Sequence, residues 1–367
     1  MLLFCIFANS SRKLPEMKSK LYKNEDFMKI FVPDYYNKFK CIADKCSDSC
    51  CVGWAIEIDG ATAEKYRGLE GDRKDELMAT LDTSDGLCFK CDSSGRCKNL
   101  DQRGLCQIIT RLGEDYLCQI CRDHPRYFNC YHGRCEGGLG LACEVAADLV
   151  LSIDSLPEIT TVESDDFVYL GEENHRFAFL ARDYFLSLLF DEGSTMEHRI
   201  GRLWSLSFAA DEALFDIICG TLDDDTPAES LLSEIPEMPF DLSAFIKENL
   251  PIFRDLEVLT PDFSDRVDAA IEKATSTDGF IEFLGKNSAY LRNLTYYFIH
   301  RYLVSDDICL SDNMTLAISC ALAVMALAFA SQDKTHAAFI TEAKDFSKNI
   351  EYSTENIETL LERIGDL

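Results

Sequence analysis

The residues best suited to chemistry in this sequence are cysteines, and most of them fall in one stretch. Thirteen of the 17 cysteines lie between Cys41 and Cys143. They include a C-x3-C-C run at Cys46–Cys51 and two C-x2-C pairs, Cys88–Cys91 and Cys118–Cys121. Soft thiolates gathered this closely have three common uses, which are iron–sulfur ligation, zinc ligation and a disulfide framework.

A disulfide framework fits the sequence least well. The apolar start MLLFCIFA has no basic residue before it, and no A-x-A-like cleavage site follows, so we expect a cytoplasmic protein. The number of cysteines is odd, and clustered thiols in a reducing compartment more often bind metal. A C-x2-C step lets two sulfur atoms of one turn reach one metal or two irons. The sequence therefore predicts a metal centre, with iron and zinc both open.

Short elements must bring these thiols together. Residues 97–106 are typical of a β-hairpin, with Gly104 taking a positive φ and Leu100 opposite Leu105. A helix is expected to begin at 113–116 and to carry Cys118 and Cys121 on one face until Pro125 ends it. Before them, alternation over 54–58 predicts a half-buried strand, and short helices are expected over 61–69 and 73–81.

Helical patterns dominate the rest of the chain. They predict helices near 141–151, 173–190, 195–219, 241–250, 264–274, 279–304, 312–331, 335–347 and 354–365, with a linker over 155–166. The apolar run 316–330 is shorter than the roughly 18–20 residues of a membrane span and is expected to be a buried core helix. We predict a mainly α protein with an N-terminal extension (1–27), a small irregular α+β cysteine-rich metal-binding domain (28–155) and an acidic all-α helical domain (156–367).

The charge is negative and unevenly distributed. Of the net −28, most arises in residues 151–367, which carry 41 acidic and 15 basic side chains. Such a surface repels nucleic acid and attracts cationic partners, or it simply keeps the protein soluble. We expect neither a nucleic-acid nor a membrane partner, and the oligomeric state stays open.

Four segments together resemble a known family. They read CIADKCSDSCCVGW, CKNLDQRGLCQI, GEDYLCQICRDHPR and CEVAADL. The pattern resembles the flagellin lysine-N-methylase family, within a broader group of cysteine-rich zinc- or iron-chelating proteins. It covers about residues 28–155 through specific motifs and the helical remainder more loosely. The resemblance implies methyl transfer from S-adenosylmethionine to the ε-amines of lysines on flagellin, by a protein that carries an iron–sulfur cluster.

The resemblance also assigns nine cysteines to metal binding. These are Cys41, Cys46, Cys50, Cys51, Cys97, Cys106, Cys118, Cys121 and Cys143. Nine exceed the four ligands of one 4Fe-4S cluster, so some are structural or a second metal is present. We favour Cys97, Cys106, Cys118 and Cys121 within one set, since the hairpin and the helix each present a same-face pair.

Some positions depart from the family pattern. The family's CPEAA is Cys143-Glu144-Val145-Ala146-Ala147 here, so no role is carried over for the glutamate. Cys88, Cys91, Cys130 and Cys135 are additions. Cys130 and Cys135 either clip a hairpin, bind a further metal or pack.

Lysine methylation asks the protein to deprotonate the amine, align it with the methyl group and exclude water. Asp115 and Tyr116 are the candidate catalytic residues; otherwise they serve as a helix-start residue and a packing residue. Arg122 and Arg126 either bind the carboxylate of S-adenosylmethionine or offset the thiolate charge. The alternative function is a non-catalytic iron–sulfur or zinc protein whose helical domain binds a partner.

Overall fold

The computed structural model describes residues 28–54, 56–84, 86–131, 133–164, 175–276, 279–305 and 308–366. Its contacts divide the chain into two compact units. The first contains Lys40–Tyr127, and the second contains Met28–Phe39 and the chain from Phe128 onward. Each unit is considered by itself. Compact units are not the same as domains, so the boundaries predicted after residues 27 and 155 stay predictions.

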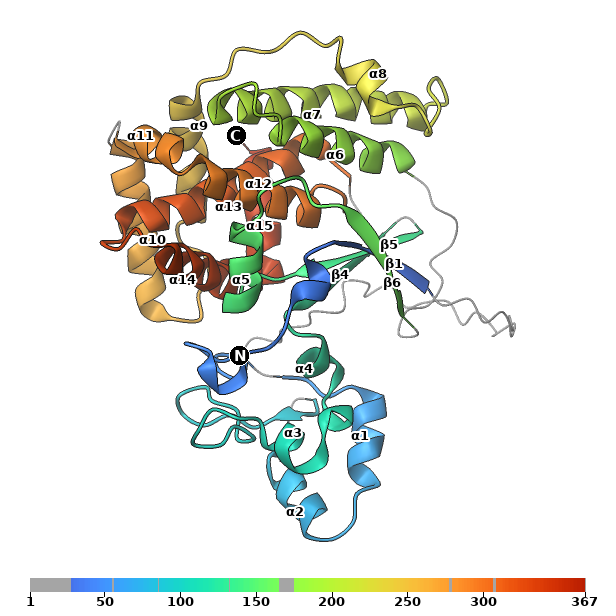
Figure 1. Cartoon of the computed structure of the whole chain (residues 1–367), viewed down its shortest axis with the longest axis vertical. Helices are drawn as coiled ribbons and strands as arrows, with labels where there is room; N and C mark the ends of the chain where they lie inside the picture. Colours follow the sequence, from blue (N-terminus) through green and yellow to red (C-terminus); the bar gives the residue numbers. More distant parts are fainter. Residues whose placement is uncertain are drawn as a thin grey trace. The chain divides into compact units, whose positions relative to one another are not determined.

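The first unit is small, irregular and α+β (Figure 1). Its α-helices are α1 (Gly60–Arg67), α2 (Asp72–Ala79), α3 (Gln107–Leu112) and α4 (Gln119–Asp123), with 3-10 turns η2 (Ala43–Lys45) and η3 (Glu114–Tyr116). Two-residue strands β2 (Leu81–Asp82) and β3 (Cys88–Phe89) pair antiparallel. In place of the strand predicted over 54–58, the structure has one isolated β-bridge between the backbones of Glu57 and Cys88. Ile56 and Ile58 are buried, as expected.

A four-stranded sheet runs along one side of the second unit. Its order is β4 (Arg126–Tyr131), β5 (Arg134–Leu139), β1 (Met28–Pro33) and β6 (Ile159–Ser164). β1 pairs parallel with β5 and antiparallel with β6, in a register that runs from Met28 opposite Ser164 to Pro33 opposite Ile159. The linker predicted over 155–166 therefore supplies a strand, whose β-branched residues suit a pleated surface. Residues 165 and 166 lie outside the described residues.

The remainder of the second unit is helical. After η1 (Tyr36–Lys38) and the sheet come α5 (Glu144–Leu151), α6 (Arg176–Leu189), α7 (Met196–Ile218), α8 (Ala228–Leu232), α9 (Leu242–Asn249), η4 (Leu250–Phe253) and α10 (Pro261–Ser276). They are followed by α11 (Gly279–Lys286), α12 (Ser288–Tyr302), α13 (Leu310–Ala330), α14 (His336–Phe346), the π-helix η5 (Ser347–Glu351) and α15 (Thr354–Gly365). The single helix predicted over 279–304 is two, because Asn287 interrupts it with a side-chain bond of 2.9 Å to the Phe283 carbonyl.

Helix α13 forms the centre of the helical unit. It packs against α7, α10, α12, α14 and α15 (Figure 1). It is the one helix in the described residues that is long and apolar enough to cross a membrane, and 89% of that window is buried inside the protein. Its many alanines let the surrounding helices approach closely. The expectation of a buried core helix is confirmed, and so is the predicted fold class: a cysteine-rich α+β region followed by a mainly helical one.

Candidate metal centre

The Cys118–Cys121 pair is fixed by a hydrogen-bonded junction between two helices. Asp59 caps α1 by accepting from the Thr62 backbone N–H at 2.9 Å, and it also accepts from the Gln119 N–H at 2.9 Å. Burial would raise the pKa of Asp59, but these N–H groups lower it. Cys118 is thereby held at the N-terminus of α4. The predicted continuous helix is wrong, since η3 ends at Tyr116 and α4 begins after Cys118.

The predicted hairpin places the next two cysteines. The Asp101 N–H donates to the Leu105 carbonyl at 2.9 Å, and Gly104 adopts a φ of 82°, as predicted. Leu100 lies opposite Cys106 rather than Leu105, so the register is shifted by one residue. Asn99 donates to the Cys97 sulfur at 3.9 Å.

Six thiols come together here, and we call them the thiol cluster: Cys50, Cys51, Cys97, Cys106, Cys118 and Cys121. The hydrogen bond with Cys50, burial, and the charges of Cys50, Cys106 and Cys97 raise the pKa of Cys51. A hydrogen bond from Cys121 lowers the pKa of Cys118, and the same bond, with burial, raises that of Cys121 well above its usual range. The charges of these thiols therefore act on one another within the first unit.

The chain turns at the adjacent pair Cys50 and Cys51. Their sulfur atoms lie 4.0 Å apart. Neighbouring side chains on an extended chain point to opposite sides, so this short distance reflects the turn at these two residues. Both thiols therefore belong to the thiol cluster.

The remaining predicted ligands are Cys41, Cys46 and Cys143. Cys41 is exposed and accepts the Ala43 N–H at 3.4 Å, and Cys46 follows the η2 turn. Cys143 belongs to the second unit, where it precedes α5. Cys91, an addition to the family pattern, forms an isolated antiparallel β-bridge through its backbone with Cys97, and both thiols are free. Burial and the charges of Cys97 and Cys88 raise the pKa of Cys91.

The thiol cluster suits a soft metal by its chemistry. Six sulfur donors match the preference of zinc and of iron–sulfur clusters. Within the described ranges, no set of three or more Cys, His, Asp or Glu side chains is already arranged to hold a metal ion. The donors sit on turns and helix ends, where small dihedral changes move a thiol. The residue types of the thiol cluster thus fit a zinc ion or an iron–sulfur cluster, and the coordination of either stays a prediction.

The candidate catalytic residues border the thiol cluster. Tyr116 is half-buried against the core that contains Cys118. Its carbonyl accepts from the Tyr66 hydroxyl at 2.7 Å. Asp115 is exposed, and its carbonyl accepts from Lys65 at 3.2 Å. No sequence signal singled out Tyr66, whose pKa is raised by burial and by the charges of Cys118, Cys121 and Cys106.

The candidate cofactor arginines lie near the end of the first unit. Arg122 in α4 forms an ion pair of 3.2 Å with Asp123, and its side chain is 47% exposed. Arg126 opens β4. Their assignment to the cofactor stays a prediction.

Other cysteine and glycine expectations concern the sheet. Cys130 and Cys135 form a disulfide between neighbouring strands β4 and β5, which is the hairpin clip among the three alternatives. Gly137 lies in β5, where an added Cβ would meet Val32 and Phe128 at 3.2 Å. His132, which by its residue type could bind a metal, lies outside the described residues.

The fold and the site define the class of protein: a cysteine-rich α+β unit and a mainly helical unit in one chain. No family model matches the chain. No solved structure matches it either.

Curated relatives do match part of the chain. It is 29% identical over 154 residues to the flagellar biosynthetic protein FliU of Salmonella muenchen. That alignment covers 38% of this chain and 81% of FliU. It is 28% identical over 131 residues to a lysine-N-methylase of Salmonella typhimurium and to one of Salmonella choleraesuis. The aligned part spans 33% of this chain and 32% of each lysine-N-methylase. The resemblance to flagellin lysine-N-methylases is confirmed to this extent.

Proposed function

We propose that this protein methylates lysine ε-amines of flagellin, with S-adenosylmethionine as the methyl donor. The observation that carries the proposal is the 28% identity over 131 residues to two lysine-N-methylases. The similarity to a flagellar biosynthetic protein supports flagellin as the substrate.

The thiol cluster is proposed to hold an iron–sulfur cluster, with zinc as the alternative. Cys97, Cys106, Cys118 and Cys121 would be its first choice of ligands. Bound there, the group would supply a rigid inorganic centre with access to redox chemistry. The rest of the proposed function concerns residues of the chain itself.

Two residues are proposed to prepare the amine. A lysine ammonium must lose its proton before its nitrogen can attack a methyl carbon. Asp115 and Tyr116 are proposed to receive that proton, and the apolar core against which Tyr116 packs would limit the access of water. Arg122 and Arg126 are proposed to bind the donor carboxylate through bidentate hydrogen bonds.

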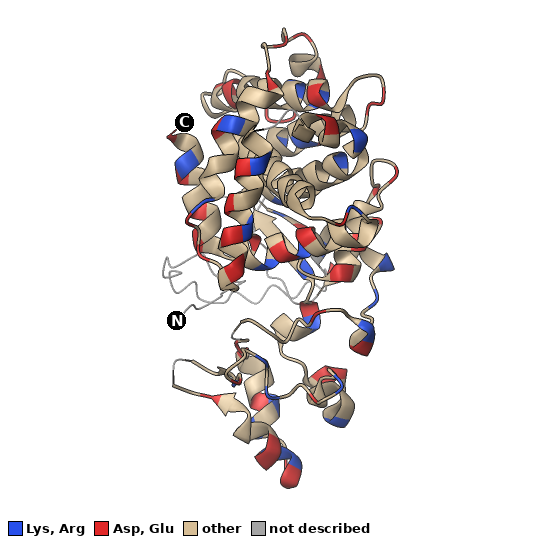
Figure 2. Cartoon of the chain, turned by 90° about the vertical axis from the view of Figure 1, so that its left-hand side faces the viewer, with Lys and Arg blue, Asp and Glu red and all other residues tan. Residues whose placement is uncertain are grey.

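The helical unit is proposed to attract the substrate by its charge. Acidic side chains are distributed over many of its helices (Figure 2). Such a field speeds encounter with a lysine-bearing protein and weakens as salt is added. Association with flagellin that does not respond to salt would contradict this role.

The test is a methylation assay on purified flagellin. Anaerobically prepared protein, flagellin and S-adenosylmethionine are incubated, and the intact mass of flagellin is measured. We expect mass increments of one methyl group each, reduced by Cys118→Ser and retained in Cys320→Ser, which alters a buried thiol in α13 of the other unit. An unchanged flagellin mass would favour the non-catalytic metal-binding alternative.

A further inference from the structure

A pocket of about 550 Å³ lies in the helical unit, away from the residues already assigned. It is formed by the α6–α7 connection, the first turns of α7, the start of α9, and α11 with the first turns of α12. Leu242, Leu284 and Leu291 give it an apolar wall. Its volume falls within the range of small-molecule sites in proteins.

Two arginines from distant parts of the sequence line this pocket. Arg199 donates to the carbonyls of Leu189 at 3.1 Å and of Ser194 at 2.8 Å. Arg292 donates to the Ile153 carbonyl at 2.6 Å and to the Asn293 side-chain oxygen at 3.0 Å. All these acceptors are neutral.

Neither guanidinium has a carboxylate within ion-pair distance among the described residues. This is unusual in a chain with 64 acidic and 36 basic side chains, where most arginines have an acidic neighbour available. The charges of Glu192 and Asp154 act on Arg292, but neither carboxylate forms an ion pair with it, so both guanidinium groups can still bind an anion.

The two guanidinium groups are also held rigidly and repel one another. Both are half-buried, and Arg292 stacks on the Phe190 ring with its guanidinium carbon 4.6 Å from the ring centroid. Burial, and then the charge of Arg199, lower the pKa of Arg292. A bound anion would remove this repulsion, and the rigid arrangement reduces the entropy lost on binding.

The remaining charges of the pocket determine the class of ligand. Glu192 and Glu197 also line it, and both are exposed. They would repel a dianion such as phosphate, but they would attract a cation carried by the same ligand. We propose that this pocket binds a small α-amino acid with an apolar substituent, its carboxylate on Arg199 and Arg292, its ammonium toward Glu192 and Glu197, and its substituent on the leucine wall.

The inference does not depend on the proposed function, since the pocket can bind such a molecule whether or not flagellin is methylated. S-adenosylmethionine also carries an α-amino carboxylate. Binding measurements with separate arginine variants therefore distinguish this pocket from Arg122 and Arg126.

The test is calorimetric titration of the full chain with four probes: L-methionine, S-adenosylhomocysteine, propionate and inorganic phosphate. We expect at least one of the two α-amino carboxylates to bind, more tightly than propionate or phosphate. Arg292→Met and Arg199→Met should each weaken that binding about tenfold or more, as expected for a lost charge-assisted contact. Arg254→Met is the matched control, because this arginine is 47% exposed and pairs with Asp268 outside the pocket.

Two further variants keep the result interpretable if an Arg→Met change disturbs folding. Arg292→Lys preserves the charge and should bind more tightly than Arg292→Met, while Glu192→Gln should weaken binding of the amino acid but not of propionate. The inference is overturned if neither α-amino carboxylate binds, if phosphate binds more tightly, or if binding is unchanged in both Arg→Met variants. If binding of both α-amino carboxylates is lost in Arg122→Met and kept in the Arg199 and Arg292 variants, the inference is overturned while the proposed function stays intact.

Discussion

The second unit contains a buried ion pair between Glu136 and Arg182. The Glu136 carboxylate in β5 accepts from the Arg182 guanidinium at 2.8 Å, and both side chains are almost fully buried. Burial alone would raise the pKa of Glu136, but the charge and hydrogen bonds of Arg182, with His300 and Arg134 nearby, hold it at about 2. Burial and the charge of Arg182 lower the pKa of His300 to about 4.

These pKa values predict that acid destabilises the second unit in two steps. Between the ordinary His300 pKa of 6.5 and its folded value of about 4, the unfolded chain binds a proton that the folded chain does not, so stability falls as the pH drops. Glu136 adds a loss of the same sign between 4.5 and about 2. His300→Asn should flatten the first step, by up to about 1.4 kcal/mol per pH unit, and leave the second.

The measurement uses the one tryptophan of the second unit. Denaturant unfolding of a Trp54→Phe variant is followed by Trp204 fluorescence at a series of pH values. An equal pH slope with and without His300→Asn would show that His300 does not cause the first step.

A second residue-scale prediction concerns the support of the thiol cluster. Tyr66→Phe removes the donor to the Tyr116 carbonyl and keeps the ring against Phe89. We expect the free energy of unfolding of the first unit to fall by about 1–2 kcal/mol, because a part-buried carbonyl loses its hydrogen bond.

Tyr116→Phe is the matched control, since it removes a hydroxyl and leaves that carbonyl bonded. It should change stability by less than about 0.5 kcal/mol while lowering the rate of flagellin methylation. Both variants are compared by Trp54 fluorescence in a Trp204→Phe background. Equal stability of Tyr66→Phe and the parent would contradict the supporting role of Tyr66.

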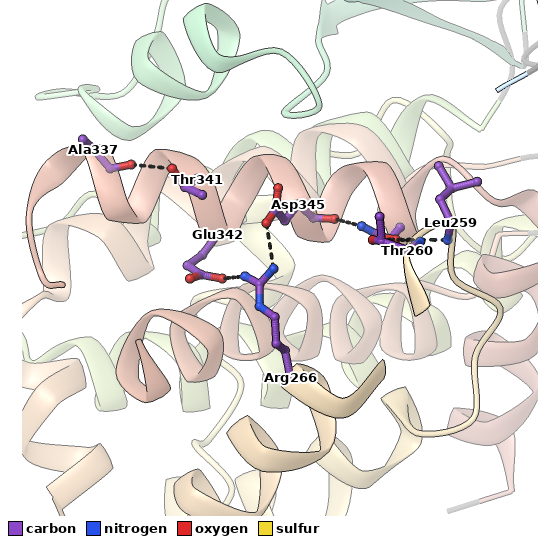
Figure 3. A network of polar contacts seen from close by, with 8 residues as sticks. Leu259, Thr260, Arg266, Ala337, Thr341, Glu342 and Asp345 are labelled. Atoms are coloured by element: carbon purple, nitrogen blue, oxygen red, sulfur yellow. Dashed lines mark hydrogen bonds and ion pairs between the residues drawn. The ribbon is translucent and has the colours of Figure 1, made fainter. Parts of the chain in front are cut away.

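At the scale of elements, a polar junction joins α10, α14 and η5. Arg266 of α10 lies between Glu342 and Asp345 of α14, with 2.8 Å to the Asp345 carboxylate (Figure 3). Next to it, the Asn349 side-chain oxygen accepts from the backbone N–H groups of Leu259 and Thr260 at 3.0 Å and from the Thr260 hydroxyl at 2.8 Å. One side-chain oxygen thus accepts three hydrogen bonds from the loop that leads into α10.

We predict that Asn349→Ala lowers the stability of the second unit by about 2–3 kcal/mol, because three donors lose one shared acceptor. Thr341→Ala in α14 is the control, since its hydroxyl only bonds back to the Ala337 carbonyl at 3.0 Å on an exposed surface (Figure 3). Urea unfolding followed by Trp204 fluorescence measures both. Similar losses in the two variants would mean that the junction contributes nothing specific.

The elements also show what a sequence can predict. The long helices were predictable because their apolar residues recur at helical spacing and most helices end near polar or glycine residues. The break at Asn287 was missed because the apolar pattern continues through it, and the interrupting bond to the Phe283 carbonyl is a side-chain contact. Strand β6 was missed because its side chains are mostly exposed and show no apolar alternation, while its pairing with β1 joins residues more than 120 apart in the sequence.

The candidate metal centre was predictable only in part. Cysteine spacing identified Cys118 with Cys121 and Cys97 with Cys106, since each pair is closed by a local turn. It could not place Cys143 in the second unit or reveal Tyr66, because those depend on long-range packing. Arg199 and Arg292 carry no sequence signal at all, since 92 residues separate them.

At the scale of the whole molecule, the two units differ in what stabilises them. The second has a continuous core around α13, whereas the first has a small core that includes Cys97 and Cys118. A small irregular unit gains much of its stability from a bound metal when it has one. Removal of metal is therefore expected to unfold the first unit and to leave the second folded, which Trp54 and Trp204 fluorescence report separately.

Metal analysis of the purified protein tests whether the thiol cluster binds an inorganic centre. Iron, zinc and acid-labile sulfide are quantified per chain in anaerobically purified protein, in parallel with Cys118→Ser and Cys320→Ser. We expect bound iron with sulfide, or bound zinc, that is lost in Cys118→Ser and kept in Cys320→Ser. Folded, metal-free protein whose cluster thiols all react as free cysteines or pair with one another would contradict it.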